Sequence, residues 1–236
     1  MTRRPFALAA ILTLMVPSCS SDPTGPSYDP DLPTSWASAV TNLYFPLVPG
    51  TVYQYESQTP EGLETITVEV MPQTRQIQGV TATVVRDRVF LDGDLIEDTY
   101  DWFAQDSGGT VWYLGEDSKE IENGQVISTE GSWEWGVDGA LPGIQMHADP
   151  AAHLDEPYRQ EFYRGVAEDF GKVIMLGQSA TVPAGSFTGC VVTEDWAALE
   201  PGQSHENKIY CPGVGLVEAF HLGAGEPHEQ LVGKSP

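Results

Sequence analysis

Basic residues are scarce in this 236-residue chain. Lysine and arginine number 11, against 34 aspartates and glutamates, and the formal net charge is −23 at pH 7. Because proteins that bind nucleic acid neutralise its phosphates with a basic surface, the composition argues against nucleic acid as a partner. An acidic surface favours either simple solubility or a divalent cation such as Ca²⁺ as part of the design.

Long apolar runs are also missing beyond residue 22, so the sequence predicts no membrane-spanning helix there. The short apolar run at residues 6–16 follows two arginines, as in a secretory signal peptide. It ends in VPSC, which resembles a bacterial lipobox although Pro17 is unusual in one. We therefore expect a lipoprotein signal peptide over residues 1–19, lipidation of Cys19, and export to the cell envelope with the N-terminal lipid as the only membrane contact. An ordinary signal peptide is the alternative.

Hydrophobic residues are sparse in the next segment, residues 20–39, which is rich in Ser, Pro and Asp. Such a composition predicts a disordered tether. Residues 40–236 show no internal repeat and are long enough to bury a hydrophobic core. We expect them to form one domain.

Cysteine is limited to three residues, and two remain if the first carries the lipid. The segments around Cys190 and Cys211 flank a Leu-Glu-Pro-Gly turn signal at residues 199–202. A hairpin that pairs Ala198 with Gln203 sets the two cysteines opposite each other, within disulfide range. The sequence predicts this disulfide in preference to a pair of metal-binding thiolates, because no CxxC partner is present.

Helical periodicity is nearly absent, and only residues 35–43 and 166–170 are candidates for a short helix. Two-residue turn signals recur at Asp92-Gly93, Gly108-Gly109 and Asn123-Gly124, each between β-branched and aromatic residues. The sequence predicts an all-β fold, a single antiparallel meander of about ten strands that curls into a barrel or strongly curved half-barrel.

The three turns, taken as two-residue loops, fix a strand register. The register pairs Asp101 with Glu116, Phe103 with Leu114, Gln105 with Trp112, Trp112 with Trp135, Leu114 with Trp133, and Asp117 with Glu130. Because side chains alternate along a strand, one sheet face would carry the acids together with aromatic side chains. We expect this face to line a cavity, with ligand-binding residues Phe103, Gln105, Trp112, Trp133 and Trp135.

The pair Asp101 and Glu116 is notable because like charges directly opposite each other destabilise a sheet. Three arrangements relieve the repulsion. The pair can lie at a wet barrel rim, where the charges are screened, share a proton, or hold a cation such as Ca²⁺. The sequence leaves these alternatives open.

Strand character is weakest in residues 136–157, which we expect to form a loop at the mouth of the barrel. This segment contains His147 and His153 beside several acids. The two histidines are candidate ligands, with Asp101 and Glu116, for Zn²⁺ or a mixed site. Solvated loop histidines are the alternative.

Several segments resemble a family of secreted, often lipid-anchored bacterial proteins. They are NLYFPLVPGTVYQYES, DTYDWFAQDSGGTVWYLGEDSKE, GSWEWGVDGALPGI, TVPAGSF and IYCPGVGLVE. The start and finish are also similar to a wider set of extracytoplasmic β-sheet lipoproteins shaped like lipocalins and lipoprotein carriers. The resemblance implies a barrel or half-barrel and a location, but no reaction. The matching segments contain Asp101 and Glu116 but not the two histidines.

No nucleophile motif of the G-x-S-x-G kind, no P-loop and no H-E-x-x-H is present, so no catalytic residue can be assigned. The function we predict is binding of a small amphipathic ligand, a divalent cation (Ca²⁺ or Zn²⁺), or both, in an aromatic, acidic cavity. The alternative is a metal-dependent hydrolase of esters or phosphoesters. A surface protein without a small-molecule site is the third hypothesis.

Overall fold

The structure, a computed structural model, describes residues 28–199, 205–221 and 227–236. Strands dominate these ranges, and the only helix within them is a single 3₁₀ turn, Pro150–His153. The predicted all-β class is confirmed. Neither of the two segments considered for helix, residues 35–43 and 166–170, forms one. In the described part of the chain we find no helix with the length and apolarity to cross a bilayer.

Within the described ranges, eighteen strands form two sheets. They are β1 (Val40–Thr41), β2 (Pro46–Leu47), β3 (Val52–Gln58), β4 (Leu63–Ile77), β5 (Val80–Leu91), β6 (Asp94–Gln105), β7 (Val111–Asp117), β8 (Glu120–Glu122), β9 (Gln125–Ser128), β10 (Trp133–Glu134), β11 (Leu141–Met146), β12 (Pro157–Arg159), β13 (Glu161–Phe162), β14 (Asp169–Val182), β15 (Gly185–Ala197), β16 (Glu206–Cys211), β17 (Gly215–His221) and β18 (His228–Ser235). The first two form a separate ribbon, and the others belong to one large sheet.

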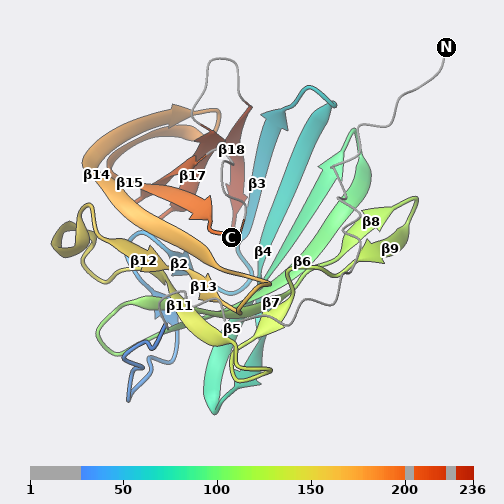
Figure 1. The fold of residues 1–236 in the computed structure, drawn as a ribbon. Helices are drawn as coiled ribbons and strands as arrows, with labels where there is room; N and C mark the ends of the chain where they lie inside the picture. Colours follow the sequence, from blue (N-terminus) through green and yellow to red (C-terminus); the bar gives the residue numbers. More distant parts are fainter. Residues whose placement is uncertain (1–27, 200–204, 222–226) are drawn as a thin grey trace.

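The large sheet is antiparallel and nearly closes into a barrel (Figure 1). Its order is β12-β14-β15-β16-β17-β18-β3-β4-β5-β6-β7-β11-β13. The two ends of this path, β12 and β13, are consecutive in the chain and are separated by Gln160 alone. The ring therefore closes through the covalent chain, which makes this point the seam of the barrel.

Alternation along the strands fills the interior. In β3, buried Tyr53, Tyr55 and Ser57 alternate with exposed residues, as expected for a strand with one face on the core. The interior cluster draws its members from all around the ring, including Phe103 on β6 and Tyr210 on β16. Side chains of this kind occupy most of the space inside a small barrel.

Two of the three predicted hairpin turns are confirmed. Asp92-Gly93 joins Leu91 directly to Asp94, and Asn123-Gly124 joins Glu122 directly to Gln125. In both turns the two loop residues have positive φ, 50° and 91° in the first and 52° and 74° in the second. This is the backbone that a two-residue type I′ turn requires.

The third turn differs from the prediction. Gln105 pairs with Val111, so the loop spans residues 106–110. The Asp106 carboxylate stabilises the longer loop, because it accepts hydrogen bonds from the Thr110 N–H and the Trp112 Nε1–H, both at 3.0 Å. The shift turns the Trp112 side chain to the other face of the sheet.

A bulge restores the register farther along this hairpin. Phe103 lies opposite Tyr113, yet Asp101 lies opposite Glu116 as predicted, because Gly115 adds one residue to β7 between these pairs. Gly115 has φ +134°, and a Cβ there would collide with the Trp133 carbonyl oxygen. Only glycine fits this bulge, and the predicted opposition of the two acids is confirmed through it.

The segment before the barrel is only partly the tether that we expected. Trp36 packs against Trp112 and Trp135 with ring centroids 6.3 and 6.2 Å apart, and Tyr28 donates a hydrogen bond to the Pro142 carbonyl at 3.0 Å. The expectation of disorder is therefore wrong for residues 28–39, because their aromatic side chains cover an apolar outer face of the sheet. The predicted signal peptide, Cys19 and residues 20–27 lie outside the described residues.

The Asn123-Gly124 hairpin does not continue the meander as predicted. Strands β8 and β9 form a short ribbon that joins β6 through Glu97 and Glu120. Trp133 consequently pairs with Glu116 rather than with Leu114, and the expected pair of Asp117 with Glu130 does not form. The chain leaves the ladder at residue 118, which explains the change of register.

The expected mouth loop at residues 136–157 contains a strand. Residues 141–146 form β11, which pairs with β7 and β13. Strand character is weak here in the sequence, but Gly143 allows the backbone of Gln160 to approach so closely that a Cβ would collide with it. The prediction of a continuous loop is wrong for this reason.

The predicted disulfide is confirmed. Cys190 and Cys211 are bonded, with Cα atoms 4.2 Å apart. Strands β15 and β16 pair from Val191–Tyr210 to Asp195–Glu206, in the register expected from the sequence. Most of the turn proposed at residues 199–202, and Gln203, lie outside the described residues.

Candidate functional site

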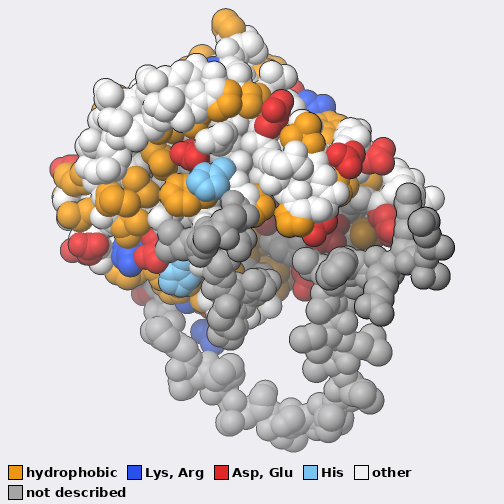
Figure 2. Space-filling model, turned by 90° about the horizontal axis from the view of Figure 1, so that it is seen from above, with side chains coloured by type: hydrophobic (Ala, Val, Ile, Leu, Met, Phe, Trp, Pro, Cys, Tyr) orange, Lys and Arg blue, Asp and Glu red, His pale blue; other side chains and the backbone are white. Residues whose placement is uncertain are grey.

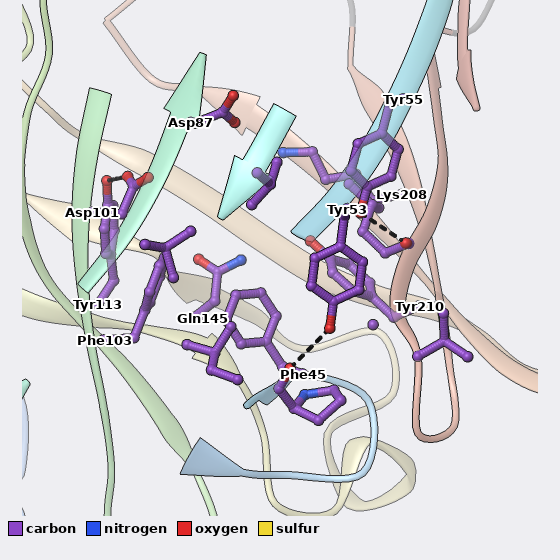
Figure 3. A pocket seen from close by; sticks show the side chains of 17 residues that line it. Phe45, Tyr53, Tyr55, Asp87, Asp101, Phe103, Tyr113, Gln145, Lys208 and Tyr210 are labelled. Carbon is purple, nitrogen blue, oxygen red and sulfur yellow. Dashed lines mark hydrogen bonds between the residues drawn. The ribbon is translucent and has the colours of Figure 1, made fainter. Parts of the chain in front are cut away.

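A cavity of about 280 Å³ lies inside the barrel (Figure 3). Seventeen residues line it, from the β1–β2 region and from β3, β4, β5, β6, β7, β11, β16 and β17. Six of them are aromatic: Phe45, Tyr53, Tyr55, Phe103, Tyr113 and Tyr210. Four are polar or charged at their tips: Asp87, Asp101, Gln145 and Lys208.

The aromatic side chains form a continuous wall. Phe103 stacks on Tyr113 with centroids 4.8 Å apart, and Phe45 meets Phe103 edge-on at 5.1 Å. The hydroxyls of Tyr53 and Tyr55 donate to the carbonyls of Pro46 and Leu216, at 3.3 and 3.1 Å (Figure 3). The polar ends of these two tyrosines are bonded within the wall, so their rings are available to an apolar ligand.

At one side of the cavity, one hydroxyl bridges the two opposed acids. The Tyr113 oxygen lies 2.6 Å from Asp101 Oδ1 and 2.9 Å from Glu116 Oε2. A tyrosine has one proton to donate, so it can donate to one carboxylate while the other carboxyl, protonated, donates to its oxygen. Burial raises the pKa of Asp101 to about 6, and burial with the nearby Asp101 charge raises the pKa of Glu116 to about 8. This geometry favours the shared-proton alternative, with the proton on Glu116.

Two further acids adjoin this pair. Asp87 lies on β5 two residues from Val85, which pairs with Asp101, so the two aspartates are diagonal neighbours on the inner face. Burial, with Asp101 nearby, raises the pKa of Asp87 well above its usual range. The Trp133 Nε1–H donates to Glu161 Oε2 at 2.5 Å, and burial beside Glu116 raises the pKa of Glu161 strongly. These carboxyls lie in low dielectric, which favours the neutral form.

Lys208 is the one basic residue among those that line the cavity. Its ammonium group lies 3.1 Å from Asp195 Oδ2 and 3.1 Å from Glu206 Oε2. Two carboxylates therefore already neutralise this cation.

The predicted ligand-binding residues divide between the two faces of the sheet. Phe103 lines the cavity, and Trp133 lies behind Tyr113 at 5.5 Å, edge-on. Gln105 is bonded elsewhere, because its Oε1 accepts from the Thr41 N–H at 2.7 Å. The expectation that Trp112 shares the cavity wall is wrong, since the longer turn places its side chain on the outer face of the sheet, where it packs against Trp36. Trp135 also contacts Trp36.

The predicted metal ligands do not assemble into one cluster. His147 and His153 stack on each other at 3.9 Å, and His153 Nδ1 lies 3.2 Å from Glu156. Burial lowers the pKa of His147 to about 4, which keeps its ring neutral. Across the described ranges, no three His, Cys, Asp or Glu side chains are arranged to hold a metal ion. Asp101 and Glu116 are held by Tyr113 instead.

Sequence analysis missed Asp87, Tyr113 and Lys208. Asp87 stands between Arg86 and Arg88 in the sequence, and this charged segment carries no motif that indicates a cavity wall. The alternating pattern TVYQYES does indicate part of the cavity wall, because it places Tyr53 and Tyr55 on one face of a strand. Elsewhere the acidic side chains are spread over the surface rather than gathered in one patch, as Figure 2 shows for the face seen from above.

Comparison with known proteins gives structural neighbours alone. No family profile matches the sequence, and no curated protein matches it. One solved structure that resembles the chain is a protein of Bacteroides fragilis, assigned as exported and with a YmcC-like fold (13% identity, TM-score 0.49, 83% of this chain and 100% of that chain). Another is a protein of Parabacteroides distasonis assigned as a lipoprotein (12% identity, TM-score 0.45, 82% of this chain and 99% of that chain).

Proposed function

We propose that this chain is an exported, lipid-anchored protein that binds a small amphipathic ligand inside its barrel. The observation that carries the proposal is the cavity of about 280 Å³, with six aromatic side chains in its wall and two carboxyls at one side. Small-molecule sites are usually concave, largely apolar and supplied with a few placed polar groups. This cavity has that composition.

Export and anchoring are supported by two features of the chain. The N-terminal residues 1–19 have the pattern of a lipoprotein signal peptide ending at Cys19. The bonded Cys190 and Cys211 suit an oxidising compartment outside the cytoplasm. A lipid on Cys19 would hold the barrel at the cell envelope.

Filling the cavity tests the proposal. The full chain with Cys19→Ser, which removes the lipid acceptor, is titrated with the uncharged fluorophore N-phenyl-1-naphthylamine. We expect saturable binding that Val68→Phe weakens at least tenfold, because residue 68 lines the cavity. The matched control is Val126→Phe, which makes the same change on exposed β9. Absence of saturable binding, or equal binding by both variants, would refute the proposal.

Binding of Ca²⁺ or Zn²⁺ and metal-dependent hydrolysis remain predictions from the sequence. No observation in the described residues favours them over the apolar ligand. Calorimetric titration of the same full chain with each ion, beside the Asp101→Asn, Glu116→Gln double variant, would measure the first directly.

A further inference from the structure

The cavity is lined by a carboxyl group, that of Asp87, with one oxygen that makes no hydrogen bond. Oδ1 of Asp87 is fully buried and makes no hydrogen bond among the described residues, although Asp87 lines the cavity beside Asp101. A buried polar atom left without a bond costs about 1–3 kcal/mol. Because the same carboxyl group lines the cavity, a small rotation of it would let a hydrogen-bond donor from outside the chain complete the site.

No cation of the described residues bonds this oxygen, although Nε of the adjacent Arg88 is itself buried without a hydrogen-bond partner. Arg86 turns to Asp98, which it contacts through two bonds of 2.8 Å, and Arg88 lies 3.8 Å from Glu69. Lys208 is engaged by two other carboxylates. The negative charges of Asp101, Glu229 and Glu97 all raise the pKa of Asp87. The missing donor is therefore best supplied by a group that carries positive charge.

We propose that the ligand carries an organic ammonium group, bound between the carboxyls of Asp87 and Asp101, while its apolar part lies against the aromatic wall. This inference rests on the proposed function and adds the charge of the ligand. Phe103 and Tyr113 adjoin the carboxyls, and aromatic faces attract cations. An ammonium needs only such hydrogen bonds and ring faces, whereas a metal ion would need more ligating oxygens than these two residues offer.

Binding of a cation at this place should release a proton. Burial, with Asp101 nearby, raises the pKa of Asp87 well above its usual range, which favours the protonated carboxyl in the empty cavity. A neighbouring positive charge favours the carboxylate. Calorimetry in two buffers of different ionisation enthalpy should then give different apparent heats for an amine and equal heats for an alcohol.

Matched displacement of the fluorophore tests the inference. In the Cys19→Ser full chain at pH 7, we expect octylamine to displace N-phenyl-1-naphthylamine at a concentration at least tenfold lower than octan-1-ol, with octanoate weakest. Asp87→Asn should reduce the preference for the amine at least fivefold and leave octan-1-ol unchanged. Asp94→Asn, the same change at an exposed position of β6, should behave as the unmodified chain.

The possible outcomes separate the two proposals. If the fluorophore binds and the three octyl compounds displace it equally, the ammonium inference is wrong and the proposed function stands. If the preference for the amine persists in Asp87→Asn with Asp101→Asn, the carboxyls are not its cause and the inference also fails. If the fluorophore does not bind, both fail. The comparison in the unmodified cavity needs no variant, so it remains decisive even if Asp87→Asn does not fold.

Discussion

Acidic side chains are treated differently in two parts of the barrel. Among β14, β15 and β16, Glu194 lies 2.5 Å from Lys172, and Asp195 and Glu206 share Lys208. Among β5, β6, β7 and β13, the acids Asp87, Asp101, Glu116 and Glu161 make no ion pair within the described residues. We call these the paired half and the unpaired half.

The difference teaches what each set of carboxyls contributes. In the paired half, Glu194, Asp195 and Glu206 each meet a lysine, so these acids contribute to the structure. In the unpaired half, burial forces the acids toward the neutral form, and a buried polar group without a full set of bonds is a cost to folding. A cost of this kind at the wall of a cavity is consistent with the binding role that we propose for these acids.

At a fixed pH, the largest expected effect lies in the paired half. Replacing Cys190 and Cys211 with alanine removes a cross-link with a sequence separation of 21. In the chain-entropy account this lowers the free energy of unfolding by about 3 kcal/mol. Urea denaturation of the Cys19→Ser chain, with and without the disulfide, measures it. A loss below about 1 kcal/mol would show that the pairing of β15 with β16 holds this half without the bond.

The second-largest loss of stability is expected when Lys208, the cation that Asp195 and Glu206 share, is replaced. Lys208→Met leaves Asp195 and Glu206 facing each other without a positive charge, so we expect a loss of about 2 kcal/mol in the free energy of unfolding. Lys234→Met is the control, because that lysine is exposed and makes no ion pair with any described residue. Equal stability of the two variants would contradict the division into halves.

A pH series tests the unpaired half. Glu116 ionises near 4.5 in the unfolded chain and near 8 in the fold, so between these values the folded state holds one proton more. Its contribution to stability is complete below pH 4.5 and is lost as pH rises through 8, at up to ~1.4 kcal/mol per pH unit. Glu116→Gln titrates at no pH, so we expect it to lose less stability than the parent chain between pH 5 and 8. Urea denaturation at each pH measures both.

The control for the pH series is Glu120→Gln, which makes the same change at an exposed residue. It should follow the parent chain at every pH. If Glu116→Gln also follows the parent chain, Glu116 does not carry the shared proton.

The smallest effect is expected at the surface. Asp117 forms a hydrogen-bonded ion pair of 2.6 Å with Lys119, but its side chain is 49% exposed. Exposed pairs contribute little because solvent screens them, so Asp117→Asn should change the free energy of unfolding by less than about 0.5 kcal/mol. A loss comparable to that of Lys208→Met would show that pairing alone, without burial, sets the contribution of an acid in this barrel.

Local signals predicted much of this fold. The dipeptides Asp92-Gly93 and Asn123-Gly124 specify their turns through backbone conformation, and the spacing of Cys190 and Cys211 sets the register of β15 on β16. Both depend on residues close in the chain. Asp101 was placed opposite Glu116 correctly, although the turn between them was wrong, because the bulge at Gly115 compensates for the longer loop.

The errors come from side-chain interactions that backbone patterns do not report, one of them local and the others distant in the chain. The Asp106 carboxylate lengthens a turn by binding the indole of Trp112, and Trp36 converts part of a supposed tether into the cover of that face. Asp87 joins the site only because β3, β5 and β16 surround one space. No pattern within a single strand reports which distant side chains will share a cavity.

The seam of the barrel has a consequence for how the molecule could be opened. Strands β12 and β13 meet through Gln160, so the circumference at that point is set by chain connectivity and not by a ladder of hydrogen bonds. A circular permutant beginning at residue 161 and ending at residue 160 would retain every strand ladder. It would nevertheless turn a ring into an open sheet, with its two free edges at one known position.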